Sequence, residues 1–397
     1  MRRFPFLGLA LPGVLALTAV TAEAQAPNIR VAGRLQAQYR MSAGDSVAGT
    51  FNPAAVSSGF EIRRLRIQTD VRFGDNMTMV IQPSFEMAAL RMRDAYLRVG
   101  LTPQLGLTLG QEKSPFQRYE LNSSNNLLSI ERGVRILGLS GREGLNDLLV
   151  NNGYASHDLG AFMDYVATDG LFTVKLGMSN GSRESTADVN NAKSFFARAT
   201  ATVFSNVDNQ PMLQIGGSFA ARDRAVCNAT ANSGTGCTTQ LAFFADSSKR
   251  TTAFGFDLEW GGFRPGLHVI ADFATGDNVL SARRINAGSF NRGNLRNTAD
   301  SNVATFRAIH LVGAYRIVTA GSDARVVKMI EPALRVDATD PNTEVNGDGG
   351  VLITPVLNVY FGATVVLRAG VDLYRYKDAA GENRSAREFK VSWQANF

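Results

Sequence analysis

The chain ends with the stretch Glu388-Phe-Lys-Val-Ser-Trp-Gln-Ala-Asn-Phe397, in which apolar and polar side chains alternate. The apolar set is Phe389, Val391, Trp393, Ala395 and Phe397, and the polar set is Lys390, Ser392, Gln394 and Asn396. Successive side chains of a β-strand point to opposite faces, so one face of this segment suits lipid and the other suits water. An aromatic last residue is also typical of the final strand of an outer-membrane barrel. The stretch therefore predicts a membrane-spanning strand.

The same alternation returns near the N-terminus. In segment 30–40, Val31, Gly33, Leu35, Ala37 and Tyr39 alternate with arginine and glutamine. In segment 64–73, Leu65, Ile67, Thr69, Val71 and Phe73 alternate with arginine, glutamine and aspartate. A sheet in a water-soluble protein can alternate in the same way, so the lengths of the connections have to decide between the two.

Extending the pattern along the chain predicts an all-β fold, a transmembrane antiparallel β-barrel of about 16 strands. We expect these strands at 29–40, 60–73, 76–87, 89–99, 104–112, 157–166, 171–179, 194–205, 211–222, 249–260, 263–274, 302–317, 324–337, 350–361, 363–376 and 386–397. The segment Val134–Ser140 could form another strand, but an odd count would place the two termini on opposite sides. We therefore assign it to a loop.

The connections alternate in length. The even-numbered ones are short, as at Gly74-Asp75, Gly261-Gly262 and Gly362, whereas most odd-numbered ones are long and polar. The long ones are 41–59, 113–156, 180–193, 223–248, 275–301, 338–349 and 377–385, and the short joint near Met87 is the exception. Short periplasmic turns and long extracellular loops are what a bacterial barrel with both termini in the periplasm shows.

The N-terminus has the pattern of a secretory signal. Arg2 and Arg3 precede an apolar run, and small residues follow at Ala22, Ala24 and Ala26. We expect cleavage after Ala24, which makes 1–24 a signal peptide and 25–397 the barrel domain. A retained anchor helix is the weaker alternative, because Pro12 and Gly13 interrupt the run. Export by this route predicts a bacterial outer-membrane location.

Cys227 and Cys237 are the only two cysteines, and they lie within a Gly-, Ser-, Thr- and Asn-rich stretch. In an oxidising envelope such a pair predicts a disulfide that closes a small outer loop. The formal charge of the whole chain is +6, so the protein is mildly basic.

A barrel of 16 strands is wide enough to enclose an aqueous lumen, which predicts a channel. The longest loop, 113–156, is the third on the extracellular side, and we expect it to fold inward as a constriction. Alternation places these basic residues in the lumen: Arg30, Arg34, Arg40, Arg64, Arg66, Arg72, Arg98, Arg198, Arg325, Arg335, Arg368 and Lys390. The lumenal acidic set is smaller: Asp70, Glu86, Asp94, Asp257, Glu259, Glu331, Asp337 and Asp372. This surplus indicates a preference for anions, although paired charges that merely line the wall are the plainer alternative.

Clusters of basic residues refine the hypothesis. The candidate anion-binding residues of the constriction are Arg63, Arg64, Arg66, Arg98, Lys113, Arg118, Arg132 and Arg198. Strict alternation turns Arg63, Arg91 and Arg93 toward lipid, so these three help the pore only if a β-bulge intervenes or if they lie at the polar rim.

Several of these residues belong to motifs that resemble the phosphate-selective porin O and P family. The motifs are Phe60-Glu61-Ile62-Arg63-Arg64-Leu65-Arg66, Arg93-Asp94-Ala95-Tyr96-Leu97, Gly110-Gln111, Ser114-Pro115-Phe116 leading to Glu120, Ser123-Ser124, Ile130-Glu131-Arg132 and Asn358-Val359-Tyr360. The resemblance implies a homotrimeric porin of 16 strands in which arginines guide small anionic solutes, among them phosphate and similar oxyanions, to a constriction. It makes the Arg63-Arg64 pair and Arg132 the foremost candidates. A dense lysine cluster is absent from the sequence, and this argues against strict selectivity for phosphate.

Two other classes of function are weaker alternatives. An enzyme would need a nucleophile beside a base, yet the histidines His157, His268 and His310 lie in no catalytic motif. A structural or adhesin-type barrel would act through its outer loops, of which 337–350 carries alternating Asp, Asn and Glu that could bind calcium. A solvated polar loop is the more economical interpretation of 337–350. We expect outer-membrane lipid as a partner, and neither a cofactor, a metal nor nucleic acid.

Overall fold

A computed structural model describes residues 26–45, 57–87, 89–139, 144–182, 184–185, 188, 193–206, 211–225, 248–262, 264–278, 304–319, 327–362, 364–377 and 382–397. The predicted signal peptide, the pair Cys227 and Cys237, and Arg325 lie outside these described residues.

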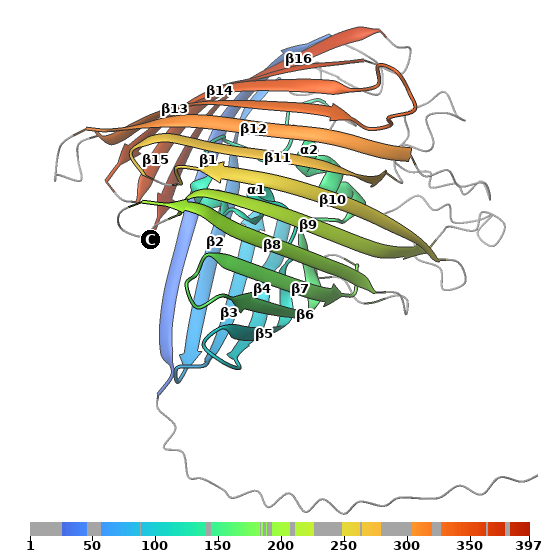
Figure 1. Cartoon of the computed structure of the whole chain (residues 1–397). Coiled ribbons are helices and arrows are strands. Elements are labelled where there is room, and N and C mark those ends of the chain that lie inside the picture. The colour runs from blue at the N-terminus through green and yellow to red at the C-terminus, as the bar shows by residue number, and fades with distance from the viewer. Residues whose placement is uncertain are drawn as a thin grey trace, which may run out of the picture.

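The described chain forms one closed antiparallel barrel in which every strand pairs with its neighbours in sequence and β1 pairs with β16 (Figure 1). The strands are β1 (Asn28–Gly44), β2 (Ser58–Phe73), β3 (Met77–Glu86), β4 (Ala89–Gly100), β5 (Leu105–Lys113), β6 (His157–Val166), β7 (Phe172–Ser179), β8 (Ser194–Ser205), β9 (Pro211–Ala225), β10 (Ser248–Trp260), β11 (Gly266–Asn278), β12 (Ala304–Val318), β13 (Val327–Asp340), β14 (Gly350–Phe361), β15 (Val365–Lys377) and β16 (Asn383–Asn396). The predicted fold class and the predicted number of strands are confirmed, with shifts of a few residues at strand ends.

The connections follow the predicted alternation. Turns at Gly74 and Gly362 are short because both glycines take a positive φ, of 59° and 64° respectively, which reverses the chain within a few residues. Segment 134–138 belongs to a loop and not to a strand. At the end that carries the short turns, Phe397 continues the pairing of β16 with β1: its backbone N–H donates to the Gly33 carbonyl at 3.0 Å.

The barrel is inside out relative to a globular protein. Along β14, outward residues such as Ile353 and Leu357 are 40% and 45% exposed, whereas the inward Asn358 is fully buried. Inward charged residues of other strands, such as Arg335 and Glu388, are buried as well. An apolar outer band with a polar interior is the arrangement that a lipid environment requires. Among the described residues, no helix is long and apolar enough to cross a membrane.

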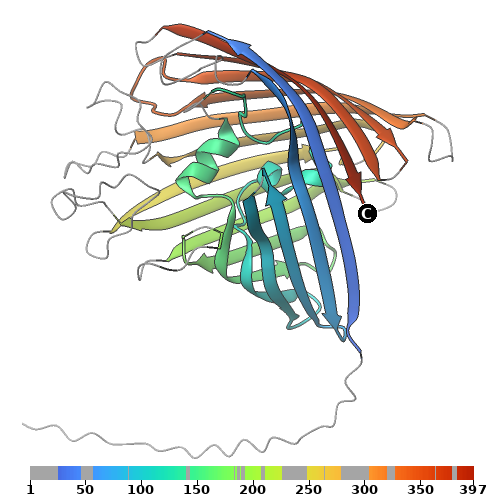
Figure 2. The same cartoon turned by 180° about the vertical axis from the view of Figure 1, so that it is seen from behind.

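The segment between β5 and β6 lies inside the barrel (Figure 2). It contains α1 (Arg118–Leu121), the 3₁₀ helix η1 (Ser124–Asn126) and α2 (Leu145–Asn152). α2 ends at Gly153, whose φ of 73° is left-handed, and the chain then returns to the wall at β6. We call this segment, residues 114–156, the inner loop.

The inner loop packs against one half of the wall. Its buried apolar side chains in two of the core clusters include Phe116, Tyr119, Leu127, Leu128, Ile130, Leu145, Leu148 and Leu149. They meet small or apolar inward residues of β8 to β14, namely Phe196, Ala220, Ala253, Ala274, Phe306, Ala308, Ile270, Val312, Ala314, Ala333 and Val356. Alanines leave room for the larger loop side chains, and burial of these apolar surfaces stabilises the inward position. Toward β2 and β5 the inner loop makes polar contacts instead, such as those of Arg63, Arg64 and Lys113.

Candidate functional site

Two β-bulges correct the predicted orientation of the arginines in β2 and β4. In β2, Gln36 of β1 pairs with Arg64 and Ala37 pairs with Ile62, so Arg63 is an extra residue. In β4, the partners of Gln82 and Pro83 are Asp94 and Met92, so Arg93 is extra there. A bulge leaves its extra residue unpaired and shifts the alternation beyond it.

Strict alternation is therefore wrong for Arg63, Arg91 and Arg93, and the alternative of an intervening β-bulge is confirmed. The side chains of Arg63 and Arg93 are only 12% and 16% exposed, and both bind lumenal carboxylates. Beyond its bulge, β4 pairs Arg91 with the buried Ser84 of β3, so Arg91 also lies on the inner face. The bulges thus add three arginines to the inner wall.

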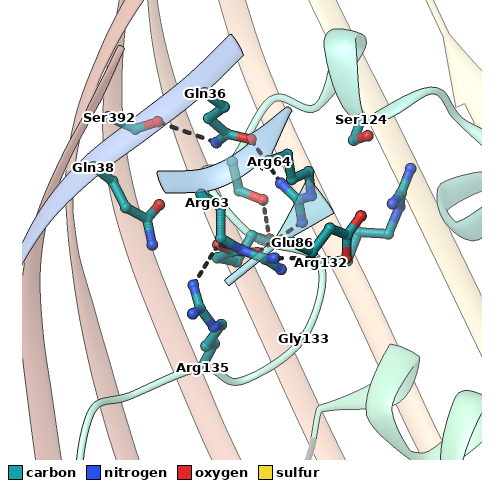
Figure 3. Close-up of polar contacts among 12 residues, drawn as sticks. Gln36, Gln38, Arg63, Arg64, Glu86, Ser124, Arg132, Gly133, Arg135 and Ser392 are labelled. Atoms are coloured by element: carbon teal, nitrogen blue, oxygen red, sulfur yellow. Dashed lines mark hydrogen bonds and ion pairs between the residues drawn. The ribbon is translucent and has the colours of Figure 1, made fainter. Parts of the chain in front are cut away.

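Glu131 of the inner loop is the centre of the first group of charges. Arg63 binds its carboxylate through two bonds, Nε to Oε1 at 2.6 Å and Nη2 to Oε2 at 3.0 Å. Arg64 Nη2 lies 3.1 Å from Oε2, and Arg135 Nη1 lies 3.1 Å from Oε1. Figure 3 shows Arg63 and Arg64 reaching from the wall toward the loop that carries Arg135. These pairs tether the inner loop to β2.

Glu86 of β3 is the centre of a second group. Its carboxylate accepts hydrogen bonds from Arg66 at 2.6 Å and from Arg93, and Arg63 Nη1 lies 3.9 Å away. Arg93 also contacts Glu184, from the connection between β7 and β8, at 2.6 Å. Since Arg63 touches both Glu131 and Glu86, the two groups form one network.

Lys113 and Arg132 form the third group, around Glu120 of α1. The nearest nitrogens of Lys113 and Arg132 lie 3.5 Å and 3.7 Å from the Glu120 carboxylate. Lys113 Nζ and Arg132 also donate to the Asn122 carbonyl, in the case of Lys113 at 3.3 Å. Both cations therefore hold the turn that follows α1.

Two carboxylates of the inner loop, Glu131 and Glu120, stay ionised because cations surround them. Burial acts to raise the pKa of Glu131, but Arg63, Arg64 and Arg135 outweigh it and hold this pKa well below the ordinary range. Burial acts in the same direction on Glu120, and Lys113 and Arg132 lower its pKa to about 2. These anions remain paired across the ordinary pH range.

The network borders two cavities. One, of about 240 Å³, has seven basic and four acidic residues in its walls. The basic ones are Arg63, Arg64, Arg66, Arg93, Lys113, Arg132 and Arg135, and the acidic ones are Glu86, Glu120, Glu131 and Asp147. The other cavity, of about 370 Å³, also has an excess of basic residues. Arg66, Lys113 and His157 line both cavities and thus mark the neck between them.

The structure brings together five of the eight predicted site residues, Arg63, Arg64, Arg66, Lys113 and Arg132, around the 240 Å³ cavity. The other three lie apart. Arg98 pairs with Asp164, Arg118 pairs with Glu259 at the opposite wall, and Arg198 binds Asp257 at 2.7 Å. None of these three lines either cavity of the network.

Sequence reasoning missed the carboxylates that organise the arginines and did not list Arg93 and Arg135 as site residues. Glu131 was visible in the motif Ile130-Glu131-Arg132, but its three partners depend on where the loop lies. Arg93 was excluded by strict alternation, and only the register across β3 and β4 shows that it is a bulge residue.

The segment 337–350 is part strand and part loop, because β13 ends at Asp340. Asp337 is buried in β13 and pairs with Arg335. Among the residues that the structure describes, no group of three His, Cys, Asp or Glu side chains could hold a metal ion.

Solved structures of similar fold are bacterial outer-membrane proteins. The outer membrane channel DcaP of Acinetobacter baumannii is 12% identical, with a TM-score of 0.56, and the match covers 94% of this chain and 98% of that one. An anion-selective porin from Comamonas acidovorans is 11% identical, with a TM-score of 0.55 and coverage of 94% and 100%. OmpT of Vibrio cholerae in a trimer form is 11% identical, with a TM-score of 0.56 and the same coverage. No curated protein matches the chain in sequence.

The closed barrel with its apolar outer band and charged interior is that of an outer-membrane porin. A family model for phosphate-selective porin O and P matches residues 30–243, more than half of the chain. The chain belongs to the phosphate-selective porin O and P family, and it resides in the bacterial outer membrane.

Proposed function

We propose that this porin is a diffusion channel for small solutes with a preference for anions. The constriction consists of Arg63, Arg64 and Arg66 on the wall, Lys113 at the end of β5, and Arg132 on the inner loop. The observation that carries the proposal is the wall of the 240 Å³ cavity, where basic residues outnumber acidic ones by seven to four. A surplus of fixed positive charge at a narrow point raises the local concentration of anions and disfavours cations.

The chemistry of the cations favours oxyanions. Six of the seven basic residues around the cavity are arginines. A guanidinium group binds carboxylate or phosphate through two parallel bonds, as Arg63 already does with Glu131. Phosphate and similar oxyanions are therefore the solutes that the proposed constriction suits.

The test is the reversal potential of the purified protein in a planar bilayer under a gradient of potassium chloride. We expect anion preference, and its reduction in Arg64→Ala and Arg132→Ala by roughly twofold to fivefold each, since one such charge contributes ~0.5–1 kcal/mol. Arg98→Ala is the control, because Arg98 lies outside the network. A cation preference in the wild type would overturn the proposal, and a structural or adhesin-type barrel would show no steady conductance.

We also propose that residues 1–24 are removed during export and that the mature chain assembles as a homotrimer. The charged start, apolar run and small residues of the N-terminus support the first part. Family membership and the trimer form of the OmpT fold relative support the second. N-terminal sequencing of the protein from outer membranes should begin at Gln25.

A further inference from the structure

The outer face of β15 and β16 carries three basic residues at the extracellular end of the barrel. Along β15 the outward residues run through Leu373 to Arg375 and Lys377, and β16 places Arg387 opposite Leu373. Arg375 pairs with Ser385, two residues from Arg387, so the two guanidinium groups are diagonal neighbours on one face. We call Arg375, Lys377 and Arg387 the rim cluster.

The rim cluster has no close ion-pair partner among the described residues. In the part of the chain that the structure describes, none of its three residues takes part in an ion pair within 4.0 Å. The nearby carboxylate of Asp45 is already satisfied, because it accepts from the backbone N–H of Ser385 at 2.6 Å and from its hydroxyl at 3.1 Å. Three outward cations in succession would repel one another without an anion between them.

Other outward cations at this end of the barrel are differently placed. Arg307 of β12 stands directly opposite Asp340 of β13. Arg250 of β10 lies over the ring of Phe195, 6.0 Å from its centre. The rim cluster differs from both in combining three positive charges on neighbouring strands with no partner among the described residues.

A hollow adjoins the rim cluster. It has a volume of about 560 Å³, and its walls include Arg375, Lys377, Arg384, the single carboxylate of Asp45 and the glycine-rich turn from Gly347 to Gly350. A β-carbon at Gly347 would lie 2.5 Å from Lys377 Nζ, so the lysine side chain packs closely against the backbone of this glycine. The hollow has room for a compact anionic group beside the cations.

Below the rim cluster, the same outer face becomes apolar. Leu373 of β15 and Phe389 of β16 lie closer to the middle of the membrane than the rim residues of their own strands, and they are 44% and 37% exposed. A molecule that fits this face needs a negatively charged head at the extracellular edge and hydrocarbon beneath it. A lipid with phosphate on its headgroup has this arrangement, and basic residues near a membrane surface each strengthen such binding.

We propose that the rim cluster binds the phosphorylated headgroup of an outer-leaflet lipid, whose acyl chains lie along β15 and β16. The occupant is a lipid and not a transported anion, because the three side chains face away from the lumen. This inference depends on the outer-membrane location of the barrel and not on its ion preference.

The test is native mass spectrometry of the full mature protein in detergent, with lipid A that carries two phosphates as the probe. The variant Arg375→Gln, Lys377→Gln, Arg387→Gln should bind it on the order of 100-fold more weakly, given the usual contribution of each basic residue. The control Arg250→Gln, Arg307→Gln should change binding by less than about threefold. Should the triple variant fail to fold, Arg387→Gln alone should weaken binding roughly fivefold.

Four further outcomes decide the proposal. Lipid A without phosphates should bind the wild type as weakly as the triple variant binds the phosphorylated probe, and Arg375→Lys should retain binding. Equal affinity for both lipids would overturn the proposal. So would a triple variant that loses its oligomeric mass but keeps the lipid, because the face would then be a contact between copies of the chain.

Discussion

At the residue scale, Glu131 joins the wall to the inner loop, since Arg63, Arg64 and Arg135 all converge on its carboxylate. Its negative charge also reduces the positive surplus of the cavity by one. Glu131→Gln should therefore raise the anion-to-cation permeability ratio by roughly twofold to fivefold, since one such charge contributes ~0.5–1 kcal/mol.

The measurement is the reversal potential of Glu131→Gln, and Asp257→Asn is the control, since each variant loses one carboxylate. Asp257 binds Arg198 away from the network, so its loss should leave the ratio nearly unchanged. An unchanged permeability ratio in Glu131→Gln would contradict the proposed location of the constriction.

The depressed pKa values of Glu131 and Glu120 predict the behaviour of the loop in acid. A carboxylate whose pKa is lower in the folded protein contributes stability above its ordinary pKa of 4.5 and loses it as the pH falls through the folded value. Because the pKa of Glu120 is about 2, the ion pairs of the inner loop should persist at pH 4 and weaken only toward pH 2.

Single-channel recordings between pH 7 and pH 2 measure this dependence. We expect the conductance of the open channel to remain steady down to pH 4. A transition in the wild type centred near pH 4.5 would show that these carboxylates titrate as free ones.

At the scale of elements, the bulge in β2 predicts an unusual tolerance to deletion. Gln36 already pairs with Arg64, and Ala37 with Ile62, so deletion of Arg63 would only remove the unpaired residue between them. Every other residue of β2 would keep its inward or outward orientation. The deletion variant should fold and insert but lose part of its anion preference. Deletion of Ile67 is the matched control, because it shifts the alternation of half the strand and should prevent assembly.

The measurement for these deletions is the yield of heat-resistant, folded protein in outer membranes. If both variants fold equally well or fail equally, Arg63 is not the extra residue of a bulge.

The packing of α2 determines how firmly the inner loop is held. Leu149 is fully buried among Phe116, Ala274 and Phe306. Leu149→Ala should remove about 2–5 kcal/mol of packing free energy from the loop, which gives a wider and noisier channel. Leu258→Ala on the outer face of β10 is the control and should leave single-channel conductance unchanged, whereas an equal change in both variants would contradict the role of α2.

At the scale of the whole molecule, the inner loop divides the lumen unequally. Its apolar side chains pack against β8 to β16, whereas the two cavities are bordered by inward residues of β1 to β7. The proposed path for solutes therefore runs off-centre, along the strands that carry the bulges.

The proposed trimer is a prediction at this scale as well. Light scattering of the detergent-solubilised protein, corrected for detergent, should give the mass of three chains. A monomeric mass under conditions that preserve channel activity would contradict the homotrimer.

The amino-acid sequence by itself determined the barrel, because alternation in each strand and the unequal connections depend only on neighbouring residues. It also identified several arginines of the proposed constriction, since Arg63, Arg64 and Arg132 lie within local motifs. Tertiary structure alone decided which face Arg63, Arg91 and Arg93 occupy, because a bulge is defined by the register of two strands. It likewise separated Arg98, Arg118 and Arg198 from the network and placed Glu131 at its centre, since the position of the inner loop results from packing between residues far apart in the chain.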